Sequence, residues 1–80
     1  MTAKTMAELT AFLAQALGLG NLDPDGGMGR TRGWDSLAHV NLMLDLEQWA
    51  GVRIPAEMMG QLTTVTAIAD HLRVEGVLAP

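Results

Sequence analysis

The hydrophobic residues of the chain recur with helical spacing in three separate segments. The first segment carries one apolar stripe at positions i, i+3, i+4, i+7 and i+8. This stripe consists of Leu9, Phe12, Leu13, Ala16 and Leu17. Thr5 and Glu8 ahead of it have the spacing of a capping box, and Gly18 and Gly20 follow it as a stop signal. The pattern predicts a helix from about Thr5 to Leu17.

A second helix is predicted from Ser36 to Ala50, because Asp35 is a favourable N-cap and Gly51 ends the pattern. Its apolar residues are too numerous for one stripe and divide between two adjacent faces. One face holds Leu42, Leu46, Trp49 and Ala50, and the other holds Leu37, Val40 and Leu44. A helix that is apolar over more than half its circumference is fully buried or offers one face to a partner. The second face therefore has two interpretations, a wider core or an interaction surface.

Two further helical segments complete the pattern. After an extended link, a short helical turn begins at Pro55 and runs through Met59. Thr63-Thr64 then serves as a cap for the last helix, which ends near residues 74–76. The apolar stripe of this helix consists of Val65, Ile68, Ala69 and Leu72. We expect the remaining tail, residues 77–80, to fray.

The segment from Leu19 to Trp34 has no hydrophobic period and is rich in turn-forming residues. Its candidate core anchors are Leu19, Leu22 and Met28. A loop of this length in a small domain is usually functional or mobile. The alternative is a plain connector, because two helices that run in roughly the same direction need a long crossover.

Composition narrows the class of protein. Of the 80 residues, 49% are hydrophobic but only three are aromatic, which favours helices packed on helices in a single domain, residues 1–80. The absence of cysteine excludes disulfides and thiolate metal sites. The net charge is −4 and the five basic residues are scattered, so nucleic-acid binding is disfavoured and a partner with a basic patch is favoured. With no apolar run of transmembrane length and no signal-peptide pattern, we expect a cytoplasmic protein.

Ser36 is the first candidate for chemistry. With Asp35 as N-cap, Ser36 occupies the first helical position, with its side chain outward beside the positive end of the helix dipole. A phosphate attached to this hydroxyl would be stabilised by the dipole and by the free N–H groups. The serine therefore suits phosphoester modification, and the alternative is a spare capping residue.

Neither histidine indicates catalysis. His39 follows Ser36 by three residues, but the nucleophile-elbow pattern is absent, since Trp34 and Ala38 stand in its two glycine places. A catalytic base also needs an orienting partner and a walled pocket, which so short a helical chain can scarcely build. We expect His39 to be a solvated helix residue and His71 to lie at the surface or at the boundary of the core.

Metal binding is not indicated either. The histidines and carboxylates lack the spacing of the usual zinc and calcium sites. Met43, Met58 and Met59 are expected to fill the core, although methionines also line adaptable contact surfaces. The residues therefore predict a protein that is not an enzyme.

The start of the second helix resembles the phosphopantetheine attachment motif of acyl and peptidyl carrier proteins, through Asp35-Ser36-Leu37. Other residues also match the spacing of that family. They are Val40, Leu42, Leu46 and Glu47, the link Val52-Arg53-Ile54-Pro55, and Leu62-Thr63-Thr64-Val65. The first-helix stripe and the long loop fall where the family has them, so the resemblance covers essentially the whole chain. The combination is far more specific than the triplet alone.

The resemblance implies an all-α fold, a small four-helix bundle with three main helices, one short helix and a long loop between the first two. In the family, a separate magnesium-dependent phosphopantetheinyl transferase moves 4′-phosphopantetheine from coenzyme A to the serine, here Ser36. Asp35 would assist recognition there. The terminal thiol of the arm holds an acyl or aminoacyl group as a thioester. The implied partner-binding surface comprises Leu37, Val40, Met43, Leu44 and Glu47.

Residues that depart from the family pattern narrow the range of pathways in which the carrier could act. Fatty-acid carriers have carboxylates where this chain has Ala38 and Asn41, which disfavours docking by charge. Trp34 before Asp35 looks more like free-standing carriers of polyketide, nonribosomal-peptide or aminoacyl-transfer pathways. We therefore expect a discrete, monomeric, non-catalytic carrier in such a pathway. Its partners would be an acyl- or aminoacyl-loading ligase or transferase and a downstream synthase or transferase, with no nucleic acid and no membrane.

Three alternatives remain open. The first is a peptidyl or aminoacyl carrier that an adenylating ligase loads. The second is a helical adaptor without a prosthetic group, which would bind a protein through Leu37, Val40 and Leu44. The third is a small serine hydrolase.

Overall fold

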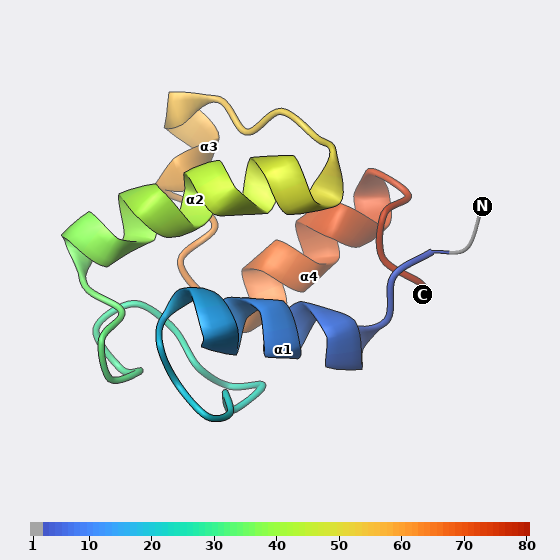
Figure 1. Cartoon of the computed structure of the whole chain (residues 1–80). Coiled ribbons are helices and arrows are strands. Elements are labelled where there is room, and N and C mark those ends of the chain that lie inside the picture. Colours follow the sequence, from blue (N-terminus) through green and yellow to red (C-terminus); the bar gives the residue numbers. More distant parts are fainter. Residues whose placement is uncertain (1–2) are drawn as a thin grey trace.

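The computed structural model describes residues 3–80, which fold into a bundle of four helices. Their bounds are α1 (Met6–Ala16), α2 (Ser36–Ala50), α3 (Ala56–Met59) and α4 (Val65–Val74). α1 packs against both α2 and α4, and α4 passes behind the pair at an angle (Figure 1). α3 is a single turn beside α2, and a long loop joins α1 to α2 (Figure 1). The predicted all-α bundle of three main helices and one short helix is confirmed.

The helices begin where the capping residues predict. Thr5 Oγ1 accepts a hydrogen bond from the Glu8 N–H (3.1 Å), and the Thr5 N–H donates to Glu8 Oε1 (2.9 Å), which completes the predicted capping box. Thr64 caps α4 by accepting from the Ala67 N–H (3.0 Å). α1 ends one residue earlier than predicted, at Ala16.

The core draws on every main helix. Its buried members include Leu9, Leu13 and Ala14 of α1, Leu42, Met43 and Leu46 of α2, and Val65, Ile68, Ala69 and Leu72 of α4. One residue of the predicted first stripe is misplaced, because Ala16 is exposed. Ala16 is the last residue of α1, whereas Ala14 is buried where the loop turns back and the Leu19 N–H donates to the Ala14 carbonyl (2.8 Å).

The long loop is anchored at its middle to the start of α4. Gly27 forms a bridge with Thr64, and the Met28 N–H donates to the Thr63 carbonyl (2.8 Å). A Cβ atom on Gly27 would lie only 3.0 Å from that carbonyl oxygen, so a side chain at this position would crowd the contact. The loop is therefore held by backbone hydrogen bonds in addition to its apolar side chains.

Of the three predicted loop anchors, Leu22 is buried and Leu19 is half-buried. The prediction for Met28 is wrong, since its side chain is exposed. Its backbone makes the contact to α4 while its side chain points outward. A hydrophobic pattern reports side chains only, so it cannot reveal an anchor of this kind.

The prediction that the C-terminal tail frays is also wrong. Lys4 and Leu78 pair as a parallel bridge, in which the Lys4 N–H donates to the Val77 carbonyl and the Ala79 N–H donates to the Lys4 carbonyl (both 2.8 Å). The Leu78 side chain is 3% exposed and belongs to the core. The two ends of the described chain consequently lie side by side (Figure 1).

Candidate functional site

Ser36 is the first residue of α2, as predicted, and its side chain is exposed. The preceding Asp35 has an extended backbone, and its Oδ1 accepts from the Ala38 N–H (2.8 Å) as the predicted N-cap. The Ser36 hydroxyl is thus held at the positive end of a 15-residue helix. This geometry is accessible to another protein and favourable for a phosphate ester.

The residues before Asp35 form a compact turn that directs Trp34 into the protein. The Trp34 N–H donates to the Thr31 carbonyl, and the Gly29 N–H donates to the Trp34 carbonyl (both 3.0 Å). Gly33 has a φ of 80°, a left-handed conformation that a side chain would strain. The indole of Trp34 is fully buried. Trp34 and Ser36 are therefore two residues apart but face opposite ways, one into the core and the other into solvent.

The expectation that His39 is solvated is wrong, because its side chain is buried with 6% exposed. Its Nδ1 accepts from the Trp34 indole N–H (3.0 Å), and its Nε2 donates to the Met59 carbonyl at the end of α3 (2.7 Å). Both partners belong to other elements of the fold. The helical period contains no sign of them, which is why sequence reasoning missed this contact.

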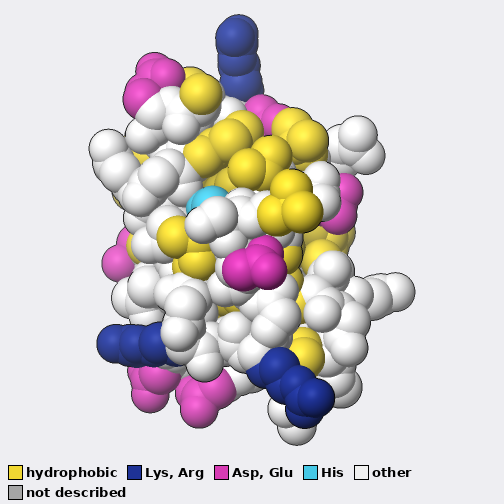
Figure 2. Space-filling model, turned by 90° about the vertical axis from the view of Figure 1, so that its left-hand side faces the viewer, with side chains coloured by type: hydrophobic (Ala, Val, Ile, Leu, Met, Phe, Trp, Pro, Cys, Tyr) yellow, Lys and Arg dark blue, Asp and Glu magenta, His cyan; other side chains and the backbone are white. Residues whose placement is uncertain are grey.

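The second apolar face of α2 is open to solvent rather than part of a wider core. Leu37 is 76% exposed, and Val40 and Leu44 are each 49% exposed. Hydrophobic side chains gather at the end of the molecule where α2 begins and α3 lies (Figure 2). We call Leu37, Val40 and Leu44 the α2 outer face.

Two other residues of the implied partner surface lie elsewhere. Met43 is completely buried, so its assignment to the partner surface is wrong and its assignment to the core is confirmed. It lies on the same face of α2 as His39 and Leu46, at i, i+4 and i+7, and that face points into the bundle. Glu47 is half-buried, and its Oε2 accepts from the Ile54 N–H (2.7 Å), which fixes the link before α3.

His71 lies at the boundary of the core, as predicted, with its Nε2 3.8 Å from Glu75 Oε1. Within residues 3–80 no group of three or more histidines and carboxylates is arranged to hold a metal ion. In the same range, none of the helices combines the length and the apolarity needed to span a bilayer.

The comparisons with known proteins agree with this geometry. Residues 7–72 match the sequence model of the family described as "Phosphopantetheine attachment site". The chain is also 35% identical, over 75 residues, to an acyl carrier protein of Streptomyces coelicolor. The alignment covers 94% of this chain and 80% of that relative. The chain therefore belongs to the acyl carrier protein family, whose prosthetic group is phosphopantetheine.

Proposed function

We propose that Ser36 is the residue that carries the 4′-phosphopantetheine arm. Ser36 is the only serine in the chain, and the family attaches its arm to a serine. The observation that carries the proposal is its position, exposed at the capped start of α2. The α2 outer face begins at the next residue, so an enzyme that reaches the hydroxyl has an apolar surface to bind beside it.

The proposed modification needs only an accessible hydroxyl from this chain. The Ser36 oxygen forms a bond to the phosphorus that carries the pantetheine arm of coenzyme A. The pyrophosphate bond breaks, adenosine bisphosphate leaves, and the serine proton passes to a base on the transferase. The dipole at the start of α2 then stabilises the charge of the phosphodiester. The thiol of the arm supplies the thioester chemistry.

In this proposal the carrier itself is not catalytic. Of the described histidines, His39 is the one close to Ser36 in sequence, and both of its ring nitrogens are engaged, by Trp34 and by the Met59 carbonyl. No ring nitrogen of His39 is left to take a proton from the serine. The hydrolase alternative therefore loses His39 as its base. In this proposal residues 1–80 act as one carrier domain, which delivers its cargo in the cytoplasm.

The proposed partners bind the α2 outer face by burying its leucine and valine side chains. The first turn of α2 contains no acidic residue, and Ala38 and Asn41 are not charged. Docking by apolar contact depends little on salt, whereas docking by charge weakens as salt screens it. This surface supports a carrier of polyketide or nonribosomal-peptide synthesis, served by an acyl- or aminoacyl-loading enzyme and a downstream synthase. A carrier loaded with an amino acid by an adenylating ligase is the alternative.

The test is incubation of the purified protein with coenzyme A, magnesium and a phosphopantetheinyl transferase of broad specificity, followed by intact mass spectrometry. We expect the wild type to gain the mass of one arm and Ser36→Ala to gain none. Thr66→Ala is the matched control, since it removes an exposed hydroxyl from α4 and leaves the modification unchanged. A wild type that stays unmodified with several transferases, yet binds a partner saturably, would favour the helical adaptor instead.

A further inference from the structure

α3 has little to hold it in place on its own. It is four residues long, its N-cap Pro55 offers no side-chain hydrogen bond, and none of its residues is fully buried. Met58 and Met59 are only partly buried against the core. A single helical turn is unstable in isolation, because nucleation fixes several residues for one hydrogen bond. The position of α3 must therefore be set by groups outside it.

Two side chains of α2 supply this support, one on each side of α3. Glu47 Oε2 accepts from the Ile54 N–H just before α3 (2.7 Å), and His39 Nε2 donates to the carbonyl of Met59, its last residue (2.7 Å). These two side chains are eight residues apart on α2, or about 12 Å along its axis at 1.5 Å per residue. α3 is thus held against α2 at both of its ends.

Trp34 fixes the hydrogen-bonding state of His39. An indole N–H is a donor only, so the His39 Nδ1 that it contacts at 3.0 Å must be the unprotonated acceptor. The proton of the neutral ring then lies on Nε2, where the Met59 carbonyl can only accept. Each contact therefore requires the tautomer that the other requires. The result is a continuous chain of hydrogen bonds from Trp34, through His39, to α3.

We propose that Trp34 and His39 are positioning residues that hold α3 beside the start of α2, so that a docking enzyme meets Ser36 and α3 as one preformed surface. The inference rests on the proposed function of Ser36, since it concerns how enzymes reach that residue. The Asp35 cap that holds Ser36 does not include the Trp34 or His39 side chains. Loss of the hydrogen-bond chain therefore reduces the fraction of molecules ready to dock and leaves the reacting hydroxyl in place.

The expected kinetic effect is a rise in KM with kcat retained. An apparent dissociation constant increases in inverse proportion to the competent fraction, so loss of one or both hydrogen bonds of this chain raises the KM of the transferase about three- to tenfold. Loss of these hydrogen bonds also increases local opening of α3. We expect faster amide exchange at Met58 and Gln61, whose N–H groups donate within and just after α3.

The chain offers a matched control for each variant. Trp34→Phe removes the indole donor and keeps an aromatic ring, and His39→Leu removes both hydrogen-bonding nitrogens and keeps a buried side chain. Trp49→Phe and His71→Leu make the same changes away from α3, at Phe12 and Glu75 respectively. We expect only the first two variants to raise KM and to speed exchange in α3, with exchange in α1 unchanged. In the wild type, NMR should find the His39 proton on Nε2.

Four results would overturn the proposal. They are unchanged KM and α3 exchange in both variants, equal effects in the controls, a proton on Nδ1, and a general loss of stability, which would appear as faster exchange in α1 as well. If the wild type is never modified, the proposed function of Ser36 fails, and the exchange and NMR results still decide the role of Trp34 and His39.

Discussion

A tryptophan lies at each end of α2, and the two tryptophans make different kinds of contact. Trp34, just before α2, is buried and donates a hydrogen bond to His39. Trp49, near the other end, is partly buried and stacks on Phe12 with ring centroids 4.6 Å apart and planes 11° apart. A hydrogen bond fixes the relative orientation of its two groups, whereas two stacked rings can shift parallel to each other. The end that carries Ser36 is thus oriented by directional contacts.

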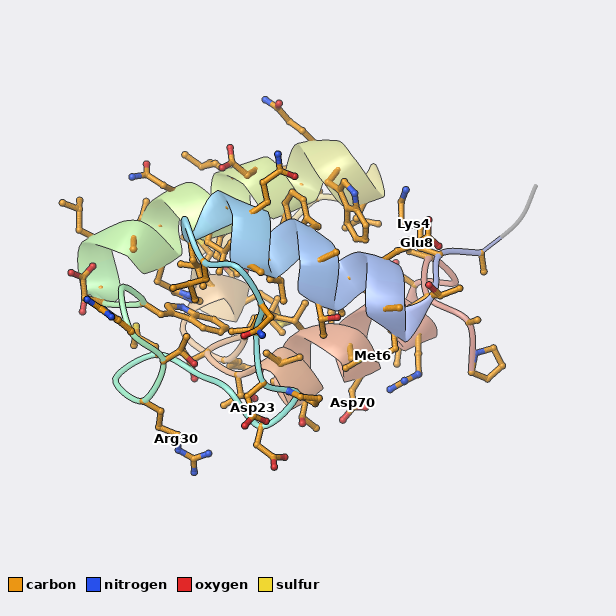
Figure 3. All side chains as sticks on the ribbon, turned by 60° about the horizontal axis from the view of Figure 1, so that its bottom comes forward. Lys4, Met6, Glu8, Asp23, Arg30 and Asp70 are labelled. Carbon is orange, nitrogen blue, oxygen red and sulfur yellow. The ribbon has the colours of Figure 1, made fainter. Side chains whose placement is uncertain are left out.

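The opposite end is closed by contacts between distant parts of the chain. Lys4 lies at that end (Figure 3), with its Nζ 4.5 Å from the centroid of the Trp49 ring. The backbone of Lys4 also pairs with Leu78, which brings the tail onto the core. This end therefore contributes to stability. We therefore expect substitutions at both ends to affect stability, but only those at the Ser36 end to affect modification.

The largest difference is expected between the two tryptophans. Trp34→Ala removes a fully buried ring and leaves His39 without its donor, so we expect a loss of about 3–5 kcal/mol in the free energy of unfolding. Trp49→Ala removes a partly buried ring and should cost about 1–2 kcal/mol. Urea unfolding followed by circular dichroism measures both. Equal losses would remove the distinction between the two ends.

The next largest effect tests the C-terminal tail. Leu78→Ala should cost about 2–4 kcal/mol, because the Leu78 side chain is buried in the core. Val74→Ala is the control at an exposed site and should change the stability by less than about 0.5 kcal/mol. The same urea experiment applies. A neutral Leu78→Ala variant would mean that the tail frays in solution.

A smaller effect is expected at the Asp35 cap beside Ser36. Asp35→Ala should cost about 1 kcal/mol, since the Ala38 N–H loses its acceptor, and Asp35→Asn should cost less because its side chain can still cap. Thr64→Ala removes the equivalent cap from α4 and should cost a similar amount. Transferase assays then separate the two caps. If Thr64→Ala slowed modification as much as Asp35→Ala, the site would not be localised at α2.

The smallest effect concerns the cation over the second tryptophan. Lys4→Met keeps the aliphatic stem and removes the charge from the Trp49 ring, so we expect a loss of about 0.5 kcal/mol. Lys4→Arg should retain the interaction. Thermal unfolding of the three proteins at equal ionic strength measures the difference. A more stable Lys4→Met variant would show that the charge does not contribute to packing at this end.

The sequence alone predicts the structural features that depend on residues close to one another in the chain. The caps at Thr5, Asp35 and Thr64 and the stripe of α4 were all found as predicted, because capping and helical period act over a few positions. The start of α2 and the exposure of Ser36 follow from the same local rules.

The misplaced residues are those whose partners come from elsewhere in the chain. His39 binds Trp34 and α3, Leu78 reaches the core through a bridge to Lys4, and the Met28 backbone pairs with the residues before α4. Met43 was assigned to both the core and the surface, and only the packed bundle decides between them. Such contacts arise from tertiary packing, which no period in a single sequence encodes.

The most direct test of the account is to locate the added arm within the chain. Trypsin cleaves after Arg32 and Arg53, and the peptide 33–53 between them contains Ser36 as its only hydroxyl side chain. After incubation with coenzyme A and a transferase, we predict that this peptide alone gains the mass of one phosphopantetheine and that the Ser36→Ala protein gains nothing. An arm on any other peptide, or a wild-type protein that no transferase modifies, would contradict the account.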